Sequence, residues 1–250
     1  MLFAKTLTGD YEDDAPWAAV RELRRIGSRD VFTRAAEFCK SSDPLVRARG
    51  IDVLAQLGRT FDHPSNSFPE ESYFVVSSLL EHECELQPLT SAIAALGHLD
   101  NPLAVPLIVR YQAHPSEEIR FRVAFALGSF PNDPRSVRTL LMLTEDADED
   151  VRDWATFGLG SQSDSDSTDI RDVLIRRLED LNEDVRDEAM AGLAKRQDQR
   201  VLPALLAAFE RSPVTSVVIE AACHLLEMKN EPKGWGPGEY AVALRKRFGM

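Results

Sequence analysis

The 250-residue chain has only three cysteines, Cys39, Cys84 and Cys223, and no two of them are spaced as C-x-x-C. This number and spacing exclude a disulfide framework and a zinc knuckle. Glycine (13) and proline (14) are too scarce for a disordered or collagen-like chain. No run approaches the ~18 apolar residues of a membrane-spanning helix, and the first residues turn acidic without the apolar core of a signal peptide. We therefore expect a folded cytoplasmic protein without a membrane segment.

An excess of basic residues is also lacking, since 41 Asp and Glu outnumber 29 Lys and Arg and give a formal net charge of -12. This balance disfavours general binding to nucleic acid or to anionic membranes, which requires a basic face. The charge is uneven along the chain: residues 18–50 hold eight basic and four acidic residues, whereas residues 145–188 hold 16 acidic residues and five arginines. A partner with a complementary basic region is therefore expected.

One helical segment recurs throughout the sequence. Large aliphatic residues return at spacings of 28, 42, 31, 32, 34 and 33 residues, and most follow a small residue four positions earlier. An aliphatic residue usually stands eight positions earlier as well, and the i, i+4, i+8 pattern forms one stripe of an α-helix. The recurring aliphatic positions are Ile26, Leu54, Leu96, Leu127, Leu159, Leu193 and Leu226.

A second helical pattern precedes six of these segments, and the connecting turns contain Asp, Ser, Asn and Pro, which cap and begin helices. Helix–turn–helix units of about 33 residues predict an all-α fold, a right-handed α–α superhelix of about seven helix pairs. We expect a single domain over residues 1–250, with an N-terminal cap repeat at 1–30, repeats at 31–230 and a C-terminal cap helix at 231–250. The preceding helices are expected at residues 31–40, 71–83, 103–113, 136–144, 169–179 and 201–210.

The segments DPLVR (43–47), DEDVR (148–152) and NEDVR (182–186) each precede a helix rich in small residues that contains L-A or L-G near its end. In this they resemble bacterial HEAT-like repeats of the type first grouped with phycobilisome (bilin) lyase subunits. The resemblance extends from about residue 17 to 227 and implies a scaffold. It also implies an alternative, a bilin-lyase-like subunit or a chaperone for a planar ligand. In each segment we expect Asp or Asn to cap the helix, and Arg to hydrogen-bond neighbouring turns and link repeats rather than bind phosphate.

Signatures of catalysis and of metal binding are absent from the sequence. There is no G-x-S-x-G, P-loop or dinucleotide fingerprint, and His82–Glu83 lacks the second histidine of H-E-x-x-H. Asp164, Asp166 and Asp169 could offer oxygen ligands to calcium, but their loop lacks the glycine turn and final glutamate of a calcium loop. We expect a solvated connector there, and no enzyme activity, cofactor or metal site.

A binding face is expected on the second helix of each unit, at positions beside the column of small residues. Two successive second helices place aromatic residues at these positions, with charged residues next to them. Aromatic and arginine side chains in a concavity are typical of protein-recognition hot spots, and they could also stack on a planar ligand. Alternatively, the aromatic residues pack between helices and are part of the core. The predicted binding residues are Phe121, Arg122, Phe125, Asp153, Trp154, Phe157, Asp187, Glu188 and Arg49.

The sequence thus predicts a non-enzymatic scaffold or adaptor that binds a protein or peptide on its concave face. The long spacing after Leu54 places an insertion at residues 59–71, either a tolerated loop or part of a binding edge. Nucleic-acid binding at the arginine-rich N-terminal repeats is a weaker alternative. The arginines concerned are Arg21, Arg24, Arg25, Arg29, Arg34, Arg47 and Arg49.

Overall fold

The computed structural model describes residues 1–211 and 213–249, and all regular elements in these ranges are helical. The predicted all-α fold is therefore confirmed. Contacts group the chain into two compact units, Met1–Phe130 (unit 1) and Pro131–Met250 (unit 2), and each is described by itself. That residues 1–250 form a single domain stays a prediction. Within the described residues, no helix is long and apolar enough to cross a bilayer.

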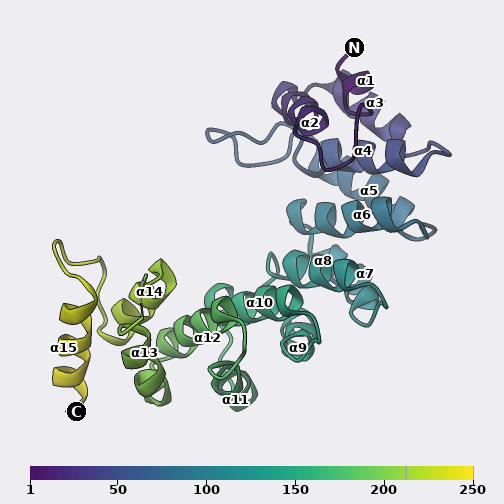
Figure 1. The fold of residues 1–250 in the computed structure, drawn as a ribbon. Helices are drawn as coiled ribbons and strands as arrows, with labels where there is room; N and C mark the ends of the chain where they lie inside the picture. Colours follow the sequence, from purple (N-terminus) through teal and green to yellow (C-terminus); the bar gives the residue numbers. More distant parts are fainter. Residues whose placement is uncertain (212, 250) are drawn as a thin grey trace. The chain divides into compact units, whose positions relative to one another are not determined.

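Unit 1 contains the second helices α2, α4, α6 and α8, each of which packs on the next (Figure 1). Their exposed side is called the second-helix face, and α3 and α5 pack on the other side, against α4 and α6. The elements are α1 (Leu2–Lys5), α2 (Asp14–Ile26), α3 (Arg29–Phe38), α4 (Pro44–Ala55), α5 (Pro69–Leu80), α6 (Leu86–His98), η1 (Pro102–Ala104), α7 (Val105–Ile108), η2 (Val109–Tyr111) and α8 (Glu117–Leu127).

Unit 2 repeats this arrangement with the second helices α10, α12 and α14, and the closing helix α15 packs on α14. Tyr240 and Leu244 of α15 are buried in the core of this unit, where the Tyr240 ring stacks on Phe209 at 5.9 Å. The elements are α9 (Pro134–Leu143), α10 (Glu149–Phe157), the π-helical turn η3 (Gly158–Gln162), α11 (Thr168–Arg177), α12 (Glu183–Lys195), η4 (Gln199–Val201), α13 (Leu202–Ala208), α14 (Ser216–Leu225) and α15 (Pro237–Phe248).

The recurring aliphatic column forms the core in the middle repeats but not at the ends. Its five central leucines, from Leu54 to Leu193, are fully buried. Ile26, however, is 43% exposed, and Leu226 is only half-buried, so the predicted register is wrong for the first and last helices. The buried aliphatic residue near the end of each helix is instead Leu23 in α2 and Leu225 in α14.

A repeated arginine joins the second helix to the turn before it. Arg47 Nη1 donates to the carbonyl oxygens of Ser41 and Ser42, six and five residues earlier, at 3.0 and 3.1 Å. We call this pair of bonds the arginine clamp. It recurs with the same spacing at Arg120, Arg152 and Arg186.

The predicted structural role of these motifs is confirmed. Arg47 and Arg152 also pair with a carboxylate of the next repeat, at 2.7 Å from Glu83 and 2.9 Å from Asp180. Before three of the four clamps the capping residue accepts a backbone N–H of the first helical turn, whereas Ser116, before Arg120, makes no side-chain cap. Side-chain caps of this kind are made by Asp43, Asp148 and Asn182.

Small residues allow neighbouring second helices to approach closely in unit 2. A Cβ atom on Gly192 of α12 would lie 2.5 Å from the Cα atom of Gly160 in η3. No side chain fits at that distance, so glycine is required where these two backbones cross.

Candidate functional site

The predicted binding residues all lie on second helices, but they divide between the two units. Phe121, Arg122 and Phe125 of α8 and Arg49 of α4 belong to unit 1; the others, on α10 and α12, belong to unit 2. The four aromatic residues Phe121, Phe125, Trp154 and Phe157 are half-buried. The two groups are therefore described as two separate surfaces.

A pocket of about 200 Å³ lies on the second-helix face of unit 1 and is called the unit 1 pocket. Arg122 and Phe125 line it, as do residues that sequence reasoning missed, from the N-terminal segment, α2, α4 and α6. The missed polar and aromatic lining residues are Tyr11, Trp17, Asp52, Gln56, Gln87, Thr90, Ser91 and His98. Arg24, which the sequence suggested only for nucleic-acid binding, also lines the pocket.

Arg49 does not take part in an exposed surface, because it is only 1% exposed. Its Nε donates to the carbonyl of Thr6 at 2.9 Å and its Nη2 to the carbonyl of Tyr11 at 2.8 Å. The guanidinium also lies 4.1 Å from the centre of the Tyr11 ring and forms an ion pair with Asp52 at 3.5 Å. The prediction that Arg49 flanks a binding patch is therefore wrong. The N-terminal segment, which is not part of the repeat, covers this position.

Two sets of hydrogen bonds between side chains hold the wall of the unit 1 pocket in place. In the first, the Tyr11 hydroxyl donates to Asp52 Oδ2 at 2.8 Å. In the second, Arg24 Nη1 donates to Gln56 Oε1 at 3.2 Å, and Gln56 Nε2 lies 2.9 Å from His98 Nε2. Because an amide nitrogen can only donate, the His98 Nε2 atom accepts, and the neutral imidazole carries its proton on Nδ1.

Positive charge dominates in this pocket. Burial, together with the charges of Arg24, Arg59 and Arg122, lowers the pKa of His98 to about 4. Burial also raises the pKa of Asp52, the one acidic residue among the described residues that line the pocket. The Nε atom of Arg122 is buried and has no hydrogen-bond partner among the described residues. The pocket thus has unmatched cationic groups in a chain of net charge -12.

On the second-helix face of unit 2, aromatic residues lie beside acids. The rings of Trp154 and Phe157 on α10 meet edge to face with their centres 5.6 Å apart. Burial, together with the charges of Asp184 and Asp150, raises the pKa of the neighbouring Asp153 to about 6. A carboxyl with this pKa is still partly protonated near neutrality, which shows that its negative charge is poorly compensated.

A second carboxyl on this face is perturbed in the same direction. Burial raises the pKa of Glu188 to about 7, although the hydroxyl of Ser161 donates to it at 2.8 Å. The negative charges of Asp153 and Glu220 contribute to this rise. We call the residues Asp153, Trp154, Phe157, Glu188 and Glu220 of three successive second helices the acidic surface.

Asp187 is not part of this surface, since it is only 2% exposed. It accepts hydrogen bonds from Arg211 Nη2 at 2.8 Å and from the Thr215 hydroxyl at 2.7 Å. Its predicted role in flanking the binding patch is wrong: the side chain joins α12 to the turn before α14. The adjacent Glu188 remains half-buried and in the acidic surface.

The loop after η3 is mostly exposed to solvent, as predicted, but it is also anchored by side chains of unit 2. The guanidinium of Arg196 donates six hydrogen bonds to backbone carbonyls, including those of Leu159, Ser163 and Ser165. The loop acids Asp164 and Asp166 pair with Lys195 and Arg171. Within the described residues, no group of three or more His, Cys, Asp or Glu side chains is placed to hold a metal ion.

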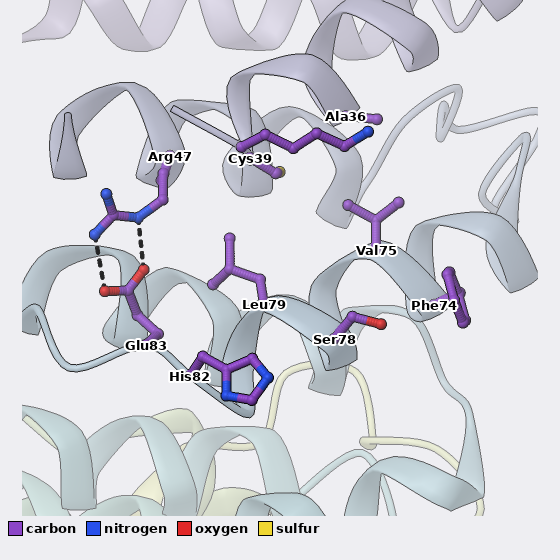
Figure 2. Close-up of a pocket in the computed structure, with 10 residues that line it drawn as sticks. Ala36, Cys39, Arg47, Phe74, Val75, Ser78, Leu79, His82 and Glu83 are labelled. Atoms are coloured by element: carbon purple, nitrogen blue, oxygen red, sulfur yellow. Dashed lines mark hydrogen bonds and ion pairs between the residues drawn. The ribbon is translucent and has the colours of Figure 1, made fainter. Parts of the chain in front are cut away.

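Unit 1 has a larger hollow, of about 470 Å³, between α3 and α5 (Figure 2). Figure 2 shows Val75 and Leu79 of α5 facing this space, with the Arg47–Glu83 ion pair at one end. Burial raises the pKa of Cys39, which also lines the hollow, to about 12, so its thiol stays protonated. The hollow is mainly apolar. Phe74, which also lines the hollow, is 70% exposed.

Comparisons with known proteins agree with this architecture. The family model described as HEAT repeats matches residues 77–160 and 141–227. Protein YibA of Escherichia coli K12 is 30% identical over 225 residues, which are 88% of this chain and 78% of YibA. The X-ray structure of E. coli YibA superposes with a TM-score of 0.70 at 27% identity, over 90% of this chain and 80% of that one.

More distant structures share the fold alone. An archaeal HEAT-like repeats protein from Thermococcus onnurineus NA1 has a TM-score of 0.56 at 17% identity, over 90% of this chain and 94% of that one. The complex of CpcE and CpcF of phycocyanin lyase from Nostoc sp. PCC7120 has a TM-score of 0.53 at 14% identity, over 98% and 92% of the two chains. The family match, the YibA relationship and the repeated helix pairs together show that the chain belongs to the HEAT-repeat family.

Proposed function

We propose that this protein is a non-enzymatic cytoplasmic adaptor that binds a basic segment of a protein or peptide partner on the acidic surface of unit 2. HEAT repeats form extended surfaces whose side chains vary while the stacking core is kept. The acidic surface lies on the second helices of three successive repeats. It combines half-buried aromatic rings with carboxyl groups from three successive second helices.

The observation that carries this proposal is the half-burial of Asp153 and Glu188 beside aromatic rings and other acids, with no basic side chain among the causes of their pKa shifts. All the charges that shift the pKa values of Asp153 and Glu188 are acidic. A lysine or arginine side chain of a partner would form charge-assisted hydrogen bonds with these carboxylates and relieve their repulsion. The same cation could lie against the face of the Trp154 ring, an arrangement that stabilises cations by about 0.5–2 kcal/mol.

The alternatives have less support. The likeness to CpcE and CpcF concerns the fold only and transfers no functional residue to this chain. Nucleic-acid binding at the N-terminal arginines is disfavoured because five of them form ion pairs within the chain. These pairs are Arg25–Glu22, Arg29–Glu71, Arg34–Glu37, Arg47–Glu83 and Arg49–Asp52.

Fluorescence anisotropy with a panel of labelled ten-residue peptides tests the proposal. Peptides with several Lys or Arg residues should bind the wild-type protein, and peptides with Glu at the same positions should not. Glu188→Gln and Trp154→Ala should each weaken binding by about tenfold, which corresponds to the loss of one good ion pair or cation–π contact.

The matched control is Glu179→Gln, which makes the same charge change at an exposed position after α11. Its affinity should stay within twofold of the wild type. Equal affinities of Glu188→Gln, Trp154→Ala and the control would refute the acidic surface as the binding site. Thermal melts of all variants separate lost binding from lost folding.

A further inference from the structure

We propose that the unit 1 pocket binds a carboxylate group carried on a short apolar or aromatic stem, with Arg122 as its main ligand. This site goes beyond the proposed function. It lies in the other unit, and its ligand has the opposite charge to a basic peptide segment. Either site can therefore fail without affecting the evidence for the other.

Hydrogen-bond donors in the pocket lack enough acceptors. The buried Nε of Arg122 has no hydrogen-bond partner among the described residues, and an unmet buried donor on a charged group is unfavourable. His98 accepts from Gln56 at Nε2, so its Nδ1 carries the ring's hydrogen and can only donate. A carboxylate has two oxygens that accept several hydrogen bonds, which suits this set of donors.

The local charges also favour an anion. Arg24 and Arg122 both line the pocket, whereas Asp52 is the one acid in its described lining. Asp52 is already engaged, since it accepts from the Tyr11 hydroxyl at 2.8 Å and pairs with Arg49 at 3.5 Å. It cannot neutralise the other two guanidinium groups as well. The low pKa of His98 agrees with this excess of positive charge.

The side chains that line the pocket determine which kind of molecule can bring a carboxylate into it. Trp17 and Phe125 line it beside the polar groups, and the edge of Phe125 packs on His98 with ring centres 5.3 Å apart. Aromatic walls favour an apolar or aromatic stem over a fully hydrated ion such as phosphate. Because the volume is only about 200 Å³, the ligand is small. It is either one acidic side chain of a partner or a free small carboxylate.

Isothermal titration of the full chain with three probes distinguishes these sources. The probes are the peptide acetyl-Ala-Phe-Glu-Ala-amide, sodium benzoate and inorganic phosphate. Tighter binding of the peptide than of benzoate assigns the site to an acidic side chain of a partner, and tighter binding of benzoate assigns it to a free carboxylate. In either case Arg122→Gln should weaken binding at least tenfold, whereas Arg110→Gln, the same change at an exposed site in η2, should leave it unchanged.

NMR titration of the His98 ring supplies a second readout that does not depend on folding stability. A carboxylate bound beside Arg122 opposes the surrounding positive charges, so it should raise the His98 pKa above its value of about 4. The proposal is overturned if no carboxylate probe binds at millimolar concentration, if phosphate binds and the carboxylates do not, or if Arg122→Gln binds the carboxylates as well as the wild type does.

Discussion

The two units are built from the same repeat, yet their second-helix faces carry opposite charge. In unit 1 the face holds a pocket with guanidinium groups in excess. In unit 2 it holds carboxyl groups whose pKa values are raised by burial and by the charges of neighbouring acids. The column of aliphatic and small residues that stacks the helices is nearly the same in both. The comparison shows that the surface residues can differ between the units while the stacking residues stay the same. The function of each unit therefore has to be examined separately.

Each unit also holds an irregular segment in place with one buried arginine, but to a different extent. Arg196 in unit 2 donates six hydrogen bonds to carbonyls of α12 and of residues 159–165. Arg49 in unit 1 donates to two carbonyls of the N-terminal segment and pairs with Asp52. The loop held by Arg196 lies between two helices, whereas the segment held by Arg49 precedes α2. We expect unit 2 to depend more strongly on its arginine.

The largest effect is expected for Arg196→Met, which removes all six bonds and leaves buried carbonyls without a donor. It should lower the free energy of unfolding by about 3–5 kcal/mol, as when one partner of a buried charged network is removed. Urea denaturation followed by circular dichroism measures this. Arg176→Met, at a half-exposed surface ion pair, is the control and should cost less than about 1 kcal/mol. A loss no larger than that of the control would show that the loop does not depend on Arg196.

Arg49→Met should lower the free energy of unfolding by about 2–3 kcal/mol, the next largest loss. The loss is smaller than for Arg196→Met because fewer hydrogen bonds are removed and the released N-terminal segment can become hydrated. Amide hydrogen exchange should increase in residues 6–13 while α6 stays protected. If Arg49→Met destabilised the protein more than Arg196→Met, the expected difference between the two units would be wrong.

The difference in charge between the two units predicts that the effect of Glu188→Gln on stability depends on pH. The pKa of Glu188 is raised to about 7 in the folded protein and is near its ordinary value when unfolded, so the folded form binds the proton more tightly. Its contribution to stability is therefore lost as the pH rises from about 4.5 to about 7. Above that range Glu188→Gln should be more stable than the wild type by roughly 1–2 kcal/mol, after allowance for solvent screening.

Denaturation at pH 4 and pH 8 tests this effect, since the difference should be close to zero at pH 4. Glu179→Gln should show no such dependence. A variant that is less stable than the wild type at pH 8 would contradict an uncompensated charge at Glu188. The expected gain in stability together with a loss of peptide binding would mark Glu188 as a residue kept for function.

The smallest effect is expected for Tyr11→Phe, which removes one hydroxyl beside Asp52 and Ser91. The free energy of unfolding should fall by about 1 kcal/mol, which is typical for the loss of one buried hydrogen bond. Comparison of Tyr11→Phe with Arg49→Met separates the contribution of the pocket wall from that of the anchored backbone. A loss as large as that of Arg49→Met would assign the anchoring to the tyrosine.

The sequence predicted what recurs with the repeat and failed where a contact does not recur. The buried leucines, the helix caps and the arginine clamps all involve residues at fixed short spacings, so periodicity reveals them. Arg49, Asp187 and Arg196 bond to groups more than 20 residues away, outside the repeated pattern. Their burial could not be derived from the stripe of a single helix. For the same reason the unit 1 pocket was missed except for Arg122 and Phe125.

The arginine clamp has a consequence for the order in which the chain folds. Each clamp joins atoms only five and six residues apart, so closing it costs little loop entropy. Contacts of this kind lower the contact order, and proteins rich in them fold rapidly. We expect the turns at Arg47, Arg120, Arg152 and Arg186 to be formed in the transition states for folding, with φ-values near one, whereas the long-range bonds of Arg49 and Arg196 form afterwards.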